Sequence, residues 1–67
     1  MNRLFDIINI DEWGTNSVVK PEGCTDWQSD EHSADFIGKN KKVLLRIVSK
    51  HKGYANDVAR EIFNNDL

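Results

Sequence analysis

The most regular pattern of apolar and polar positions lies near the C-terminus, in residues 54–64. When this segment is wound at about 100° per residue, its apolar and polar residues separate onto opposite halves of the helical wheel. The apolar half holds Tyr54, Ala55, Val58, Ala59, Ile62 and Phe63, and the polar half holds Asn56, Asp57, Arg60, Glu61 and Asn64. The pattern predicts an amphipathic helix over 54–64.

The apolar run that precedes it, residues 43–48, fits a helix over 41–52. In that helix Asn40 is the N-terminal cap and Gly53 ends the last turn in a left-handed conformation. Three basic residues then form one row on the polar side: Lys42, Arg46 and Lys50. The caps and the absence of proline favour this helix.

The same run also fits a buried strand, because short apolar runs satisfy the helical and the extended templates about equally. As a strand over 42–48 it would pair with residues 34–38 across a turn at 38–40. This strand remains the alternative to the helix over 41–52.

Helix-start signals are found in residues 25–37. Thr25 and Gln28 have the spacing of a capping box, and acidic residues follow near the positive end of the helix dipole. Trp27, Ala34 and Ile37 form a candidate buried stripe, and Gly38 a candidate end. These signals predict a helix over 26–37.

Residues 1–24 give a weaker pattern. The apolar run 4–10 fits a helix and a strand equally well, and a turn follows it. Residues 17–20 read as a short extended piece that ends at Pro21, because the proline ring disfavours helix in the residue before it. We expect this part to be irregular or a short β-hairpin.

Together these elements predict a mostly α fold for one small domain, residues 1–67, that is helical over 25–64. Two or three helices are expected, over 26–37, 41–52 and 54–64. The alternative, with residues 42–48 as a strand, is an α+β fold.

Size and cysteine content limit the class of protein. A chain of 67 residues with 39% apolar content supports one marginal core. The one cysteine, Cys24, excludes an internal disulfide, which is typical of a chain from a reducing compartment. The N-terminal apolar stretch is too short and too polar to span a membrane. We therefore expect a cytoplasmic protein without a membrane association.

Charge is divided between the two halves of the chain. Residues 1–36 hold two basic and eight acidic side chains, a net charge of −6. Residues 37–67 hold seven basic and three acidic side chains, a net charge of +4. Such asymmetry hints at a macromolecular partner, and mutual neutralisation of the two halves on folding explains it equally well.

The residues suited to catalysis or metal binding are few. Cys24, His32 and His51 have spacings that match no zinc pattern, in which ligands come in close pairs. No two glycines lie close enough to form a phosphate-binding loop. We expect no enzyme activity, no cofactor and no metal.

The sequence therefore favours a small non-enzymatic protein that binds another protein, as a regulator or inhibitor of a larger protein or complex; self-association is a further option. Exposed aromatic residues are the strongest anchors of such contacts, which makes Trp13 and Trp27 the first candidates. The charged candidates for the same interface are Asp26, Asp30, Glu31, Lys42, Arg46 and Lys50.

The alternative function is nucleic-acid binding by a unit resembling a helix-turn-helix. Helices over 41–52 and 54–64, hinged at Gly53, have that order. The second helix would then present Asn56, Arg60 and Asn64 to base edges. Asp57 and Glu61 on the same surface would repel phosphates.

Overall fold

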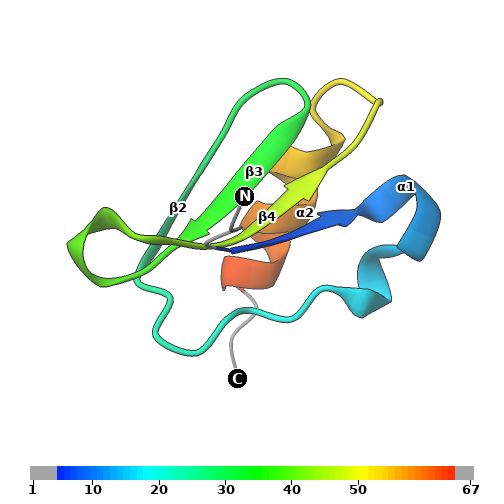
Figure 1. The fold of residues 1–67 in the computed structure, drawn as a ribbon. Helices are drawn as coiled ribbons and strands as arrows, with labels where there is room; N and C mark the ends of the chain where they lie inside the picture. Colours follow the sequence, from blue (N-terminus) through cyan, green and yellow to red (C-terminus); the bar gives the residue numbers. More distant parts are fainter. Residues whose placement is uncertain (1–4, 65–67) are drawn as a thin grey trace.

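The structure, a computed structural model, describes residues 5–64. Its centre is one mixed sheet of four strands, against which one longer helix packs (Figure 1). The strands are β1 (Asp6–Asn9), β2 (Asp26–Ser29), β3 (Ser33–Ile37) and β4 (Val43–Val48). The helices are α1 (Ile10–Trp13) and α2 (Tyr54–Asn64), with short 3-10 turns η1 (Thr15–Ser17) and η2 (Lys39–Lys41).

The strand order is β1-β4-β3-β2. β3 pairs antiparallel with β2 and with β4, whereas β1 pairs parallel with β4. The segment after β1 crosses from one edge of the sheet to the other before β2 begins (Figure 1). The predicted N-terminal hairpin is therefore wrong for the described residues, because the first strand joins a distant strand rather than its own neighbour in sequence.

The predicted helix over 26–37 is also wrong, because this segment forms β2, a tight turn and β3. The side chain of Asp30 closes the turn by accepting hydrogen bonds from the backbone amides of His32 and Ser33, 3.0 Å each. The segment alternates with a period of two: Ala34 and Phe36 are buried toward α2, and Asp35 points to the opposite face.

The predicted helix over 41–52 is wrong as well. Residues 43–48 form β4, which pairs with β3 as in the α+β alternative. The register shifts at Leu44, where Ile37 pairs with Val43 and Phe36 with Leu45. Asn40 is not a helix cap: its φ of 63° places it in a left-handed turn between the two strands.

The predicted helix over 54–64 is confirmed as α2. Its buried residues Ala55, Val58 and Ala59 belong to one core with Phe36 and Ile47, and Ile62 and Phe63 are partly buried against it. Leu45 and Ile47 face this core, whereas Val48 lies on the other face of β4, because side chains alternate along a strand.

The mostly α fold and the helix-turn-helix interpretation are both wrong. The element before Gly53 is a strand, so within the described residues α2 has no partner helix across that glycine. The protein has an α+β fold with one helix longer than a single turn in that part of the chain. Within residues 5–64, no helix is long and apolar enough to cross a membrane.

Candidate functional site

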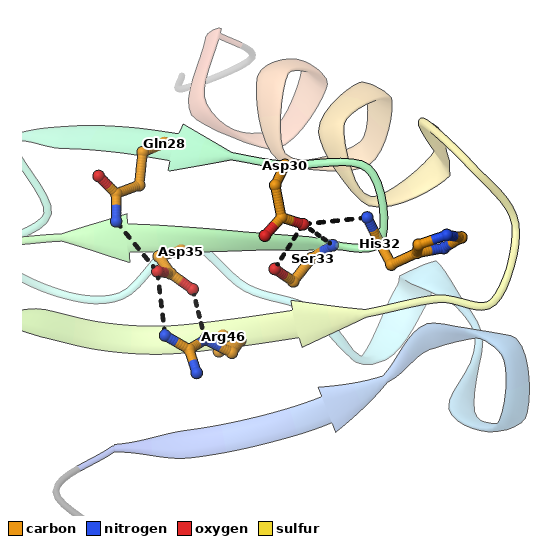
Figure 2. A network of polar contacts seen from close by, with 6 residues as sticks. All are labelled: Gln28, Asp30, His32, Ser33, Asp35 and Arg46. Carbon is orange, nitrogen blue, oxygen red and sulfur yellow. Dashed lines mark hydrogen bonds and ion pairs between the residues drawn. The ribbon is translucent and has the colours of Figure 1, made fainter.

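The face of the sheet opposite α2, the outer face, carries a polar network across three neighbouring strands (Figure 2). Asp35 lies at its centre with 6% of its surface exposed. It accepts hydrogen bonds from Arg46 Nε at 2.7 Å and Nη2 at 3.3 Å, and from Gln28 Nε2 at 3.2 Å. Every carboxylate oxygen of this nearly buried acid is therefore paired.

The side chain of Arg46 is held on the sheet by contacts with Asp35 and Phe5. Its hydrogen bonds to Asp35 raise the pKa of the guanidinium above the ordinary value. The ring of Phe5 lies 4.9 Å from the guanidinium carbon, a cation–π contact. The predicted row of Lys42, Arg46 and Lys50 is consequently interrupted, because its middle charge is neutralised within the fold.

The predicted acidic residues lie on and beside the β2–β3 turn. Asp30 Oδ1 also accepts from the Ser33 hydroxyl, and these bonds, that of the His32 amide first, lower the pKa of Asp30 (Figure 2). Exposed Glu31 forms a 3.4 Å ion pair with Lys52. Asp26 accepts from the amide of Trp27. These side chains therefore serve local structure, whichever partner the protein has.

A second set of contacts, which the sequence did not reveal, joins α1 to the end of β4. Asp11 accepts from the Ser49 hydroxyl at 2.8 Å and from the Lys50 amide at 2.7 Å; we call this the Asp11 clasp. The hydrogen bond from the backbone amide of Lys50 is the main reason that the pKa of Asp11 is lowered. Asn9, which caps α1 through the Asp11 amide, is the one local signal for this turn.

The clasp holds the turn that carries Trp13. The chain enters this turn through Ile10 and leaves it through Val18, and both are buried in the core. Between and beside these anchors, Trp13 is 71% exposed and Val19 is 73% exposed. Trp13 is therefore an aromatic side chain displayed from a fixed backbone.

Trp27 has a different environment. It pairs with Phe36 across β2 and β3, and it packs against the buried core from its half-exposed position. Its indole therefore contributes to the packing of the sheet against α2.

Three lysines surround the turn between β3 and β4; we call Lys39, Lys41 and Lys42 the lysine tip. All three are exposed. The turn is closed by hydrogen bonds from the Gly38 amide to the Lys42 carbonyl, 2.8 Å, and from the Lys42 amide to the Lys39 carbonyl, 3.3 Å. Figure 1 shows it projecting from the end of the sheet far from α1.

The three residues suggested for base recognition do not form one free surface. Asn56 is half-buried and accepts a 2.6 Å hydrogen bond from the Ser29 hydroxyl. Arg60 pairs with Asp57 at 3.6 Å, and Asn64 lies exposed at the last turn of α2. The helix face expected to enter a groove is thus partly turned toward β2.

The residues suited to chemistry are separated. Cys24 donates to the carbonyl of Asp26, and His32 Nδ1 lies 3.1 Å from the carbonyl oxygen of Ser49. An open depression of about 960 Å³ lies beside His32, between the β2–β3 turn and α1. Within residues 5–64, no cluster of three histidine, cysteine or acidic residues has the arrangement to hold a metal ion.

Comparison of the chain with protein-family models, with curated proteins and with solved structures finds no match.

Proposed function

We propose that this chain is a small, non-enzymatic binding protein that regulates or inhibits a larger protein by inserting Trp13 into an apolar pocket of that protein. The observation that carries this proposal is the 71% exposure of an indole on a backbone fixed at both ends. Large apolar side chains displayed in this way are the usual centres of protein–protein interfaces.

The fixed backbone matters energetically. The buried Ile10 and the Asp11 clasp hold the turn before Trp13, so little backbone entropy is lost when the indole docks. Burying the exposed part of an indole stabilises a complex by roughly 2–4 kcal/mol at about 25 cal/mol per Å². A single preorganised tryptophan can therefore dominate the affinity of a small interface.

As a candidate anchor, Trp13 can be tested by substitution more directly than Trp27. Because Trp27 packs against the core, its removal would also destabilise the fold. Removing the exposed Trp13 leaves the core unchanged, so its effect on binding is separable from an effect on stability.

The test is affinity capture from lysate of the native host, with the wild-type chain and two variants as bait. Trp13→Ala removes the proposed anchor, and Ile7→Ala is the control, because it truncates another exposed apolar side chain, on β1. We expect proteins that are retained by the wild type and by Ile7→Ala, survive nuclease treatment and are lost with Trp13→Ala.

The same capture can contradict the proposal in two ways. Proteins retained equally by all three baits would show that Trp13 is not an anchor. Retention that disappears with nuclease would show that nucleic acid, rather than a protein pocket, mediates the association.

A further inference from the structure

We infer that the lysine tip is a second docking element, which binds an acidic segment of a protein independently of Trp13. The tip and α1 lie toward opposite ends of the sheet (Figure 1), so one element can be engaged while the other stays free. The inference therefore goes beyond the proposed function.

The first argument is unpaired charge. Three other basic residues in the described part of the chain form ion pairs: Arg46 with Asp35, Lys52 with Glu31 and Arg60 with Asp57. Lys50 forms none within residues 5–64, but it is a single isolated charge. Within residues 5–64, no hydrogen bond or ion pair involves the side-chain ammonium of Lys39, Lys41 or Lys42. Three uncompensated positive charges therefore lie within four consecutive residues.

The second argument is backbone conformation. Asn40 and Lys41 both have positive φ, 63° and 60°, at the two central positions of the turn. Turns of this kind strongly favour asparagine followed by glycine. Asn40 satisfies the first preference, whereas a lysine occupies the place that suits glycine. Strained residues of this kind cluster at functional sites, so the charge at position 41 is the feature that needs an explanation.

The third argument excludes an ordinary role for surface lysines. Lysines often protect the edge strands of a sheet against pairing with another chain. The lysine tip instead joins β3 and β4, which are the two central strands. Edge protection therefore does not explain three lysines at this turn.

The base of the tip is also held firmly. A side-chain carbon at Gly38 would lie 2.9 Å from Leu44 Cδ1 and 3.1 Å from the carbonyl oxygen of Gly23. A larger residue there would displace the Leu44 side chain and crowd the Gly23 carbonyl, so this position favours glycine. The lysines are thus presented from a hairpin whose root is packed against neighbouring chain.

The charge distribution favours an acidic protein segment over nucleic acid. The tip is a local positive point on a chain with a net charge of −2. An extended phosphate backbone would meet the acidic remainder as well as the tip. The tip also lacks arginine and aromatic residues, the usual partners of bases. A localised cluster of carboxylates on a protein matches it better.

The test is a titration of the ¹⁵N-labelled protein with a short oligoglutamate peptide at about 0.15 M salt, where screening reaches about 8 Å. We expect amide shifts concentrated at residues 39–42. In the variant Lys39→Gln, Lys41→Gly, Lys42→Gln, affinity should fall at least about tenfold. Lys50→Gln is the matched control, because it removes an exposed lysine at the opposite end of β4.

Trp13→Ala should bind the peptide like the wild type, which separates this inference from the proposed function. Shifts that are absent at the tip, or that persist in the triple variant, would overturn the inference. A short DNA duplex that shifts the same amides and binds more tightly than the peptide would also overturn it, in favour of nucleic acid.

Discussion

The side chains of Asp11 and Ser49 form a 2.8 Å hydrogen bond across 38 positions of sequence. Ser49 is almost fully buried, with 4% of its surface exposed, and its hydroxyl also accepts from the amide of His51. The clasp therefore fixes α1 to the loop between β4 and α2. Trp13, two residues after Asp11, is positioned by this contact between distant segments.

Replacing the buried hydroxyl should weaken the clasp. We expect Ser49→Ala to lower the free energy of unfolding by about 1–2 kcal/mol, because the hydroxyl serves both the Asp11 carboxylate and the His51 amide. Thr15→Ala, which removes an exposed hydroxyl, is the control and should change little. Urea denaturation measures both values. Equal stabilities of the two variants would show that the clasp does not hold α1.

Acid should destabilise the protein through Asp11 and Asp30. Hydrogen bonds to these carboxylates lower both pKa values below the ordinary 3.8, so the unfolded chain takes up these protons at higher pH than the folded protein. Their contribution is complete above about pH 5 and is lost as the pH falls through the lowered pKa values. Asp11→Asn with Asp30→Asn should show a shallower loss of melting temperature below about pH 4. A wild-type slope in that variant would contradict this assignment.

Removing the backbone strain at Lys41 should raise the stability of the protein, whereas the changes described above lower it. Its left-handed conformation costs about 1–2 kcal/mol, and glycine removes this cost while adding about 0.5–1 kcal/mol of entropy to the unfolded chain. Lys41→Gly should therefore stabilise the protein by roughly 0.5–1 kcal/mol. Lys39→Gly is the matched control: its φ is not positive, so glycine there should destabilise slightly. Thermal unfolding compares the two, and a lower melting temperature for Lys41→Gly would exclude strain at this turn.

The effects of substituting Asp35 and Arg46 on stability should not be additive, because the two side chains are paired on the outer face. Arg46→Ala leaves the nearly buried Asp35 carboxylate without its charged partner and with only the hydrogen bond from Gln28, and we expect a loss of about 1–3 kcal/mol. Replacing both residues by apolar ones, Asp35→Leu with Arg46→Met, should recover much of that loss. A double-mutant cycle measured by denaturation tests this. A double variant that is less stable than Arg46→Ala would show that Asp35 does more than balance Arg46.

The part of the fold that the sequence predicted correctly is the part that local pattern determines. In α2, the apolar face of Tyr54–Asn64 repeats with the helical period over the whole element, so no distant information is needed. In β4, six consecutive residues fit both periods, and pairing with β3 and β1 decides between them.

The error over residues 26–37 has a physical cause. Thr25 and Gln28 imitate a capping box, and the acidic residues that follow suit a helix start. The carboxylate of Asp30 instead closes a turn on its own backbone, a competing use of the same residue type. The hydrogen bonds from the Asp30 side chain therefore stabilise a turn between two strands where the sequence pattern had predicted a continuous helix.

The candidate surfaces were predictable only by residue type. The sequence identified Trp13 as an aromatic candidate but could not separate it from Trp27, because only the tertiary fold packs Trp27 against the core and leaves Trp13 exposed. The Asp11 clasp joins positions too distant for any local pattern. Of the lysine tip, the sequence singled out only Lys42, as one member of a row on the predicted helix over 41–52, because the turn at residues 39–42 was not recognised.

The central claim is that Trp13 anchors this protein to a protein partner. Isothermal titration of the captured and purified partner with wild type, Ile7→Ala and Trp13→Ala tests it most directly. The account predicts that Trp13→Ala keeps its melting temperature and loses more than about tenfold in affinity, about 1.4 kcal/mol, while Ile7→Ala binds like the wild type. Equal affinities for the wild type and Trp13→Ala would contradict it.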